Sequence, residues 1–221
     1  MRRDFISNVS HELRTPVSVI MANSETLVDG ALDDKKQSKV FAKAILHNAE
    51  RLSDMVSSLL DLSRIDYGEL KLNIEELPIN EHINKAIDSL KNLGKRKNIS
   101  IMCSCSKGKI VLADKNALER ILNNLIENAF KYSDSQSTIN ISTKKVKDHL
   151  EISVKDSGRG IPDEEQDFLF DRFYRTAEAR ATEEKGSGLG LAIVKNLVNN
   201  LNGEVGVCLL YTSPSPRDVV P

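Results

Sequence analysis

The sequence predicts an α+β protein in two parts, a helical hairpin over residues 1–66 followed by an α/β sandwich over residues 70–207. In the first part, apolar residues recur at steps of three and four, as they do on one face of a helix. In the second part, short alternating segments typical of strands are interleaved with helical stretches, without a regular strand–helix–strand repeat. This order favours helices on one face of a mixed sheet.

The first helix is expected to span residues 2–28 and to carry a polar pair on its wet side. Its apolar positions repeat every four residues: Phe5, Val9, Leu13. His11 lies two positions from that apolar row, so it points away from it, and Glu12 stands beside it. Pro16 has no N–H for the carbonyl of Glu12, so a bend is expected there. Taken alone, such a pair is an ordinary solvated face.

A second helix is expected after a stop at Asp29–Gly30 and a start at Asp33–Asp34. Its apolar seam alternates steps of four and three, as in a heptad repeat: Phe41, Ile45, Asn48, Leu52, Met55, Leu59, Leu62. Asn48 is the polar member of this seam. Two such helices cannot bury their seams well alone, so we expect either dimerisation into a four-helix bundle or coverage by a partner domain of the same chain.

The second part is expected to contain the following elements. Strands are predicted at 70–74, 99–105, 110–112, 139–146, 150–154 and 204–210, the fourth and fifth forming a hairpin. Helices are predicted from Asn80, from Asp114 to Tyr132, and over 191–201. The glycine-punctuated stretch 156–190 is long for a connection inside a compact domain, which is typical of a functional lid.

Composition narrows the classes of function. The chain has 221 residues and a net charge of −1, which gives no electrostatic case for binding nucleic acid or an anionic membrane. No signal peptide or membrane-spanning run is visible, so no membrane contact is expected. Cys103 and Cys105 alternate on one expected strand without nearby ligands, which favours a place in the core over a metal site and fits a reducing compartment.

Three polar stretches could carry chemistry. Asn124, Asn128 and Lys131 share one face of a helix, with Tyr132 following, and could hold a metal ion and phosphate; on spacing alone an ordinary polar face is the better reading. DSGRGIP at 156–162 follows a strand and permits a tight turn. GSGLGL at 186–191 opens a helix whose N–H groups could face phosphate. Its spacing fits neither the dinucleotide-binding fingerprint nor the P-loop.

The order of these stretches resembles the catalytic core of sensor histidine kinases of two-component systems. The matching motifs are SHELRTP at 10–16, NLIENAFKY at 124–132, DSGRGIP at 156–162, FLFDRFYR at 168–175 and GSGLGL at 186–191. The resemblance covers nearly the whole chain. It implies an ATP-binding domain of the histidine kinase, gyrase and heat-shock-90 type over 70–207 and a dimerising phosphotransfer hairpin over 1–66.

The resemblance also implies roles for individual residues. His11 would accept the γ-phosphoryl group of ATP, Glu12 would orient its ring, and Thr15 would orient water during dephosphorylation of a regulator. Arg172 and Arg175 would steady the transferring group. ATP would be held by Asn124, Asn128, Lys131, Tyr132, Asp156, Gly158, Gly160, Gly186, Gly188, Gly190 and Leu191. Asn128 would bind Mg²⁺, and Asp156 would accept a hydrogen bond from the adenine amino group. Phe170 and Phe173 would anchor the lid.

The implied protein is a homodimer that phosphorylates a response regulator receiver domain. This fragment would be cytoplasmic, with its parent anchored in the bacterial inner membrane. Two alternatives remain open at this point, a nucleotide-gated ATPase without kinase activity and an inactive dimeric signalling scaffold.

The C-terminal end departs from the family pattern. After Val207 the chain reads CLLYTSPSPRD, without the glycine-rich turn and alternating last strand of the family. This stretch resembles the translation of a sequencing-library adapter. We therefore expect residues 208–221 to be a non-native tail and the last strand of the ATP-binding domain to be missing.

Overall fold

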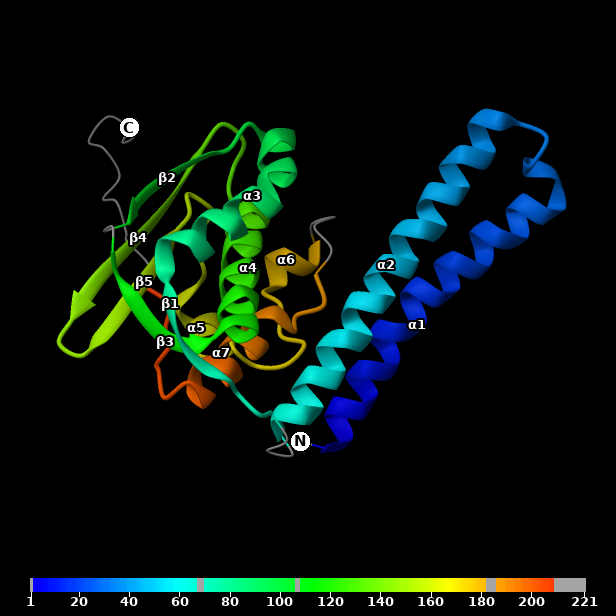
Figure 1. Cartoon of the computed structure of the whole chain (residues 1–221). Coiled ribbons are helices and arrows are strands. Elements are labelled where there is room, and N and C mark those ends of the chain that lie inside the picture. Colours follow the sequence, from blue (N-terminus) through cyan, green and yellow to red (C-terminus); the bar gives the residue numbers. More distant parts are fainter. Residues whose placement is uncertain (1, 67–69, 106–107, 182–185, 209–221) are drawn as a thin grey trace, which may run out of the picture.

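The computed structural model describes residues 2–66, 70–105, 108–181 and 186–208. A long helical hairpin comes first and an α/β sandwich follows it (Figure 1). The hairpin consists of α1 (Arg2–Thr26), a short π-helix (Leu27–Ala31) and α2 (Lys35–Asp66). None of the helices in the described ranges is long and apolar enough to cross a membrane.

The hairpin turn uses the residues that the sequence singled out. Gly30 has φ of 128°, a conformation that side chains rarely adopt, so the chain can reverse there. Asp34 Oδ1 accepts hydrogen bonds from the N–H groups of Lys36 at 2.7 Å and Gln37 at 3.2 Å. The N–H groups of Gln37 and Lys36 hold the pKa of Asp34 below its ordinary value. α1 runs through Pro16, which is buried, without ending there.

The predicted seam of α2 is confirmed, because all seven of its residues are buried or half-buried. Asn48 is 5% exposed, and its Nδ2 donates to the carbonyl of Ala44 at 2.8 Å. α1 covers part of this seam. The C-terminal end, with Met55 and Leu62, instead packs against α4 and α7 of the sandwich. The alternative of an intramolecular partner domain therefore holds for that end of the helix.

The sandwich is built from these elements: β1 (Ile74–Pro78), α3 (Ile79–Lys97), β2 (Ser100–Cys105), β3 (Ile110–Asp114), α4 (Lys115–Tyr132), β4 (Thr138–Val146), β5 (His149–Lys155), α5 (Asp163–Gln166), α6 (Ala177–Ala181) and α7 (Gly190–Asn200). β1 pairs antiparallel with β3 in a two-stranded sheet. β2 pairs parallel with β4, which pairs antiparallel with β5. The predicted hairpin of β4 and β5 and the mixed sheet are confirmed.

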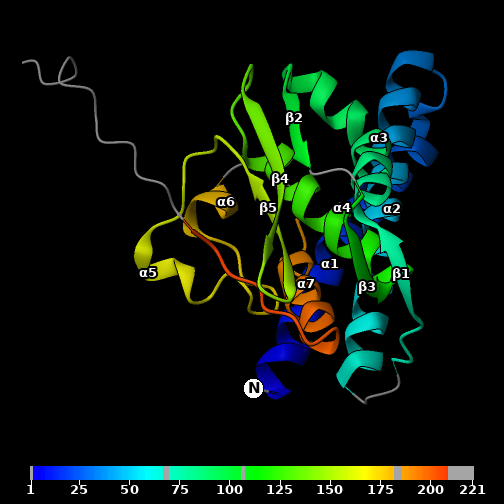
Figure 2. The same ribbon diagram turned by 60° about the vertical axis from the view of Figure 1, so that its left-hand side comes forward.

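The elements form layers (Figures 1 and 2). Helices α3 and α4 pack on the sheet through a core centred on Ile83, Leu122, Ile126, Ile139 and Ile141, each of them fully buried. On its other side, α4 joins α7 and the end of α2 in a second core. α4 therefore lies between the sheet and the hairpin, and its polar face remains at the side of this stack.

Two predicted element starts are wrong. The strand expected at 70–74 begins only at Ile74, because Leu70 and Leu72 pack against the second core instead of pairing with a strand. α3 begins at Ile79, directly after Pro78, so Asn80 lies inside the helix and is not its N-cap. The fixed φ of proline suits both the end of a strand and the entry into a helix.

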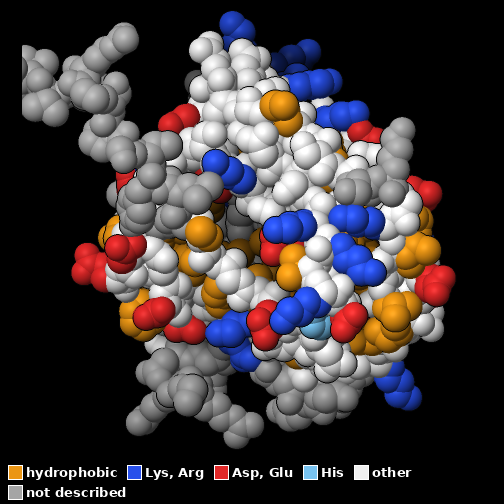
Figure 3. Space-filling model, turned by 90° about the vertical axis from the view of Figure 1, so that its left-hand side faces the viewer, with side chains coloured by type: hydrophobic (Ala, Val, Ile, Leu, Met, Phe, Trp, Pro, Cys, Tyr) orange, Lys and Arg blue, Asp and Glu red, His pale blue; other side chains and the backbone are white. Residues whose placement is uncertain are grey.

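The strand predicted at 204–210 is also wrong for residues 204–208, which are irregular, and the rest of that range lies outside the described residues. In the part of the chain that the structure describes, β5 is an edge strand without a partner on its far side. Val205 still packs against the second core although it joins no sheet. The face in Figure 3 is hollowed, and hydrophobic side chains are visible inside the hollow.

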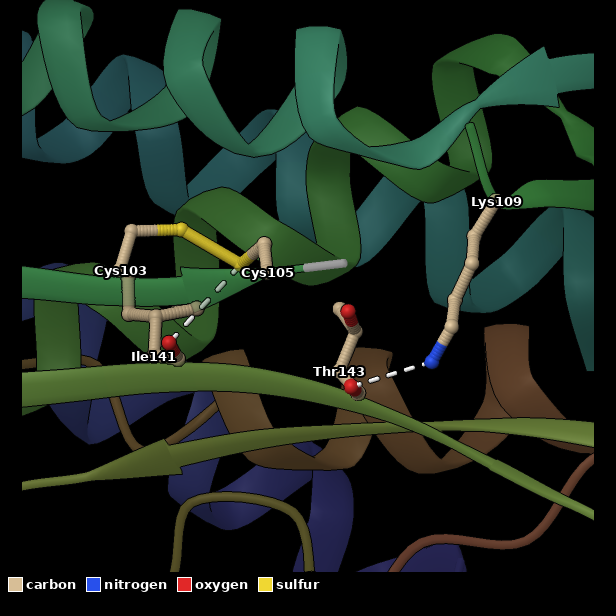
Figure 4. Close-up of a disulfide and its surroundings, with 5 residues drawn as sticks. All are labelled: Cys103, Cys105, Lys109, Ile141 and Thr143. Atoms are coloured by element: carbon tan, nitrogen blue, oxygen red, sulfur yellow. Dashed lines mark hydrogen bonds between the residues drawn. A yellow bond between two sulfur atoms is a disulfide. The ribbon is translucent and has the colours of Figure 1, made fainter. Parts of the chain in front are cut away.

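The cysteines differ from the expectation. Cys103 and Cys105 point to the same side of β2, as the alternation predicted, but they are joined by a disulfide (Figure 4). Cys103 is exposed, so the predicted core position is wrong for it, whereas Cys105 packs at the margin of the core. The two cysteines are two residues apart on an extended strand, so their side chains project from the same face of that strand.

The carboxylate of Asp114 connects the start of α4 to the chain before β1. Its Oδ1 accepts from the N–H of Ala117 and its Oδ2 from the N–H of Asn73, both at 2.9 Å, so one carboxylate caps α4 and fixes the entry to β1. We expect Asp114→Ala to lower the free energy of unfolding by about 1–2 kcal/mol, the usual cost of losing an N-cap. Urea denaturation measures this.

The controls for this substitution are Asp114→Asn, which keeps one acceptor, and Glu25→Ala, which removes an exposed acid elsewhere. The first should retain most of the stability and the second all of it. Equal midpoints for Asp114→Ala and the wild-type chain would show that the cap contributes nothing.

Candidate functional site

A cavity of about 2970 Å³ opens beside α4. Its wall includes α4, the residues after β5, the segment before α6 and the start of α7. Every residue that the resemblance assigned to nucleotide binding lines it: Asn124, Asn128, Lys131, Tyr132, Asp156, Gly158, Gly160, Gly186, Gly188, Gly190 and Leu191. Ligand pockets usually measure about 300–1000 Å³. The cavity is larger because it continues along α2 and past the free edge of β5.

The polar face of α4 presents amide oxygens and an ammonium to this cavity. Asn124 Nδ2 donates to the carbonyl of Arg120 at 2.8 Å, which directs its Oδ1 away from the helix backbone. Lys131 Nζ pairs with Glu127 Oε1 at 2.6 Å, one turn earlier. Amide oxygens suit Mg²⁺, and ammonium groups suit phosphate. The described residues contain no cluster of three or more His, Cys, Asp or Glu side chains that could hold a metal, and Asn124 and Asn128 line the cavity with their amides.

The loop after β5 is tied to the end of α4. Asp156 Oδ1 accepts from the N–H of Gly158 at 2.8 Å, which fixes the direction of the carboxylate. Gly158 forms a β-bridge with Ser133. A Cβ on Gly158 would lie 2.6 Å from the carbonyl oxygen of Tyr132, so only glycine permits this approach. The loop therefore keeps its position only while the last turn of α4 keeps its own.

The glycines before α7 pack against the FLFDRFYR segment at 168–175, called the phenylalanine motif below. The N–H of Phe173 donates to the carbonyl of Gly188 at 2.9 Å. Gly188 has φ of 68°, and a Cβ there would lie 2.7 Å from the backbone of Phe173. Between the glycines, Leu189 is fully buried in the second core, an anchor that the sequence analysis missed. α7 then begins at Gly190, and its first two residues, Gly190 and Leu191, line the cavity.

The two arginines of the phenylalanine motif separate. Arg175 lines the cavity and donates to the carbonyl of Ala179. Arg172 is half-buried and is absent from the cavity wall. Nearby, Tyr174 also lines the cavity. Desolvation and the carboxylate of Glu165 raise the pKa of its phenol above the ordinary value. Of the two arginines, Arg175 is the one on the cavity wall, where it can contact a ligand.

The histidine of the first motif is exposed on α1 and does not line the cavity. Beside it, Glu12 pairs with Arg51 of α2, with 3.4 Å between Oε2 and the guanidinium nitrogen. Thr15 Oγ1 donates to the carbonyl of His11 at 3.4 Å. Neither Glu12 nor Thr15 reaches the cavity. In this arrangement the hairpin motif and the cavity are therefore two separate sites.

α2 supplies part of the cavity wall, which the sequence analysis did not predict. The residues involved recur at helical spacing: His47, Glu50, Arg51, Asp54 and Ser58. Arg51 both lines the cavity and pairs with Glu12, so it connects the two sites. The helical spacing of these residues was the one feature of the sequence that could have predicted this wall. However, polar residues at such intervals usually mark the solvent-exposed side of a helix.

Two family models match the chain. The "His Kinase A (phospho-acceptor) domain" matches residues 1–68, and the "Histidine kinase-, DNA gyrase B-, and HSP90-like ATPase" matches residues 113–218. The sensor-like histidine kinase SenX3 of Mycobacterium tuberculosis is 38% identical over 206 residues, which are 93% of this chain and 50% of that protein. The sensor histidine kinase WalK of Bacillus subtilis is 35% identical over 224 residues, 96% of this chain and 36% of WalK. The chain thus spans at most about half the length of these relatives.

Solved structures give the same result. The histidine kinase AdeS of Acinetobacter baumannii superposes with a TM-score of 0.71 and 27% identity, covering 86% of each chain. The histidine kinase ThkA, solved in complex with the response regulator protein TrrA, has a TM-score of 0.70 over 90% of this chain and 55% of its own. Its identity is 23%, so this likeness concerns the fold.

The contact between Gly190 and Asn124 gives a test of the cavity as a ligand site. A Cβ on Gly190 would lie 2.7 Å from Asn124 Oδ1, so Gly190→Ala must displace this amide. We expect about tenfold weaker binding of Mg-ADP, equivalent to about 1.4 kcal/mol, measured by isothermal titration calorimetry.

The matched control is Gly206→Ala, because nothing lies within 4 Å of a Cβ at that position. This control should bind Mg-ADP like the wild-type chain. If both alanine variants bound with wild-type affinity, the approach of α7 to Asn124 would have no part in binding.

Proposed function

Because this chain belongs to the sensor histidine kinase family of two-component systems, we propose that it uses ATP to phosphorylate His11 and then passes the phosphoryl group to an aspartate of a response regulator. One observation carries the proposal. All the residues that match the nucleotide motifs meet in one cavity, while the histidine stays exposed on a separate helix, where a second domain and a second protein can reach it.

In the proposed reaction a ring nitrogen of His11 attacks the γ-phosphorus in line with the bond to the bridging oxygen. That bond breaks, ADP leaves, and a phosphohistidine remains. Glu12 would accept a hydrogen bond from the other ring nitrogen and so orient the ring. Mg²⁺, when bound, would neutralise charge on the phosphates, and Asn128 would be its ligand. Lys131 and Arg175 contribute positive charge along the cavity wall.

The position of the two sites requires a movement before transfer. His11 does not line the cavity, whereas α2 closes one side of it. The sandwich must therefore leave its present seat on α2 and bring the nucleotide to a histidine of the same or of a second chain. Thr15, one turn from His11, is the residue that we assign to positioning water if the protein also removes phosphate from its regulator.

The hairpin has a surface suited to the proposed dimer. Exposed apolar side chains fall on one side of α1 (Val17, Met21), in the π-helix that follows it (Val28) and on one side of α2 (Leu46, Val56, Leu60). On α2 this surface is distinct from the seam against α1 and from the flank that lines the cavity. A four-helix bundle made by two hairpins would bury it. The parent of this chain would be a membrane-anchored sensor whose cytoplasmic part includes these two domains.

The chemical identity of the product tests the proposal. Incubation with γ-labelled ATP and Mg²⁺ should give an acid-labile, base-stable label, because a phosphoramidate hydrolyses in acid. His11→Gln should abolish the label while Mg-ADP still binds. His149→Gln, which removes an exposed histidine of β5, is the matched control and should label normally.

Other results would favour the other functions. Label retained in His11→Gln would exclude His11 as acceptor. ATP hydrolysis unaffected by this substitution, without label, would point to a nucleotide-gated ATPase. A folded chain that neither labels nor hydrolyses would be a signalling scaffold.

The dimer has its own test. Leu46→Glu combined with Leu60→Glu places charges in the exposed apolar surface of α2, where burial without a partner is costly. We expect the wild-type chain to be dimeric and the double variant to shift to monomer, measured by light scattering after size exclusion. Lys43→Glu changes charge on a different flank of α2 and should remain dimeric. A double variant with unchanged mass would place the dimer interface elsewhere.

A further inference from the structure

Lys97, the last residue of α3, reaches across to the end of α4. Its Nζ donates to the backbone carbonyls of Lys131 and Ser133, the latter at 3.4 Å. Its own carbonyl accepts from the N–H of Gln136 at 2.9 Å, so the chain after α4 is held at two points. Lys97 is half-buried and lines the cavity. No motif pointed to this residue.

The electrostatics of that position favour a cation. The last carbonyls of a helix lack intrahelical donors and carry a partial negative charge. Lys97 meets one of these carbonyl groups, that of Lys131, and also the carbonyl of Ser133, the residue directly after the helix; the carbonyl of Tyr132, between them, faces Gly158. Without the ammonium, the carbonyls of Lys131 and Ser133 would lose a charged donor beside the loop that carries the Asp156 carboxylate.

The position of the α4 terminus affects the ligand-binding residues of the loop after β5. Ser133 pairs with Gly158, and Gly158 donates to Asp156 Oδ1 at 2.8 Å. A shift of the α4 terminus therefore moves Gly158, and with it the direction of the Asp156 carboxylate. Lys91, on the same helix α3, instead pairs with Asp88 one turn earlier and faces solvent, with 60% of its side chain exposed. Lys97 is distinguished by where its ammonium points.

We propose that Lys97 is a positioning residue for the base-binding end of the cavity: by neutralising the end of α4 it keeps Asp156 and Gly158 in place and sets the selectivity for adenine. The inference rests on the proposed nucleotide function, because it assigns a role to a residue of that same site. It adds a residue that acts through the loop and does not itself contact the nucleotide.

The experiment compares Lys97→Met, which keeps the length and removes the charge, with Lys97→Arg, which keeps the charge and donors. Lys95→Met removes an exposed lysine of α3 and is the matched control. Binding of ADP, GDP and inorganic tripolyphosphate is measured by calorimetry. We expect Lys97→Met to bind ADP about tenfold more weakly, since hydrogen bonds to charged groups are lost, to bind tripolyphosphate nearly normally, and to discriminate less between ADP and GDP.

Lys97→Arg should recover most of the ADP affinity, and Lys95→Met all of it. In the labelling reaction, KM for ATP should rise in Lys97→Met while the rate at saturating ATP is kept. If Lys97→Met does not fold, as judged by circular dichroism, Lys97→Gln, which keeps a donor without the charge, replaces it and should show a loss of ADP affinity of the same kind.

Several results would overturn the inference alone. These are unchanged ADP affinity in the uncharged variant, an equal loss for ADP and tripolyphosphate, and a loss that arginine does not recover. The last two would mean that Lys97 only stabilises the fold. A wild-type chain that binds neither nucleotide would instead refute the nucleotide function, and that outcome is recognised before any variant is compared.

Discussion

The C-terminal end of α2 is buried against α4 and α7, and this contact sets the arrangement of the two parts. Met55 and Leu62 are each 1% exposed in a core that they share with Ile193 and Val194. Full burial of such side chains stabilises by about 1.5–3 kcal/mol each. The ion pair of Asp61 and Arg120 at the same contact is about one-third exposed, and pairs of that kind contribute about 0–1 kcal/mol. Apolar burial therefore contributes most of the stability of the contact between α2 and the sandwich.

The contact between α2 and the sandwich explains why α2 has three different sides. One side packs on α1, a second lines the cavity, and a third presents apolar residues to solvent. A helix whose polar flank closes the cavity cannot at the same time expose that cavity to a histidine on another helix. Separation of the sandwich from α2 would expose Met55 and Leu62 to water, and the free energy of their burial would be lost. A signal that alters the packing of the hairpin would therefore change how readily the sandwich separates from it. The same contact would thus couple the stability of the arrangement to the proposed phosphoryl transfer.

The parts of the site that the sequence predicted are those that lie in the motifs shared with the family. Gly158 and Gly188 are required there by close backbone approaches. Asn124 and Asn128 share a helix face whose spacing alone favoured an ordinary polar surface, so the order of the motifs was needed to point to them. The wall contributed by α2 depends on tertiary packing, and Arg51 was indistinguishable from a solvated residue. The fold shows the same limit. The alternation of Leu70 and Leu72 predicted a strand, but their burial is satisfied by the second core, and no sheet partner is available.

Arg51 shows why the two sites should be considered together. It is 17% exposed, pairs with the carboxylate beside His11 and lines the cavity that would hold the nucleotide. While Glu12 accepts from Arg51, that carboxylate has part of its acceptor capacity engaged away from the imidazole. Arg51 therefore links the carboxylate beside His11 to the α2 side of the cavity wall. Movement of the sandwich away from α2, which the proposed transfer requires, would change the surroundings of this ion pair as well as those of the cavity.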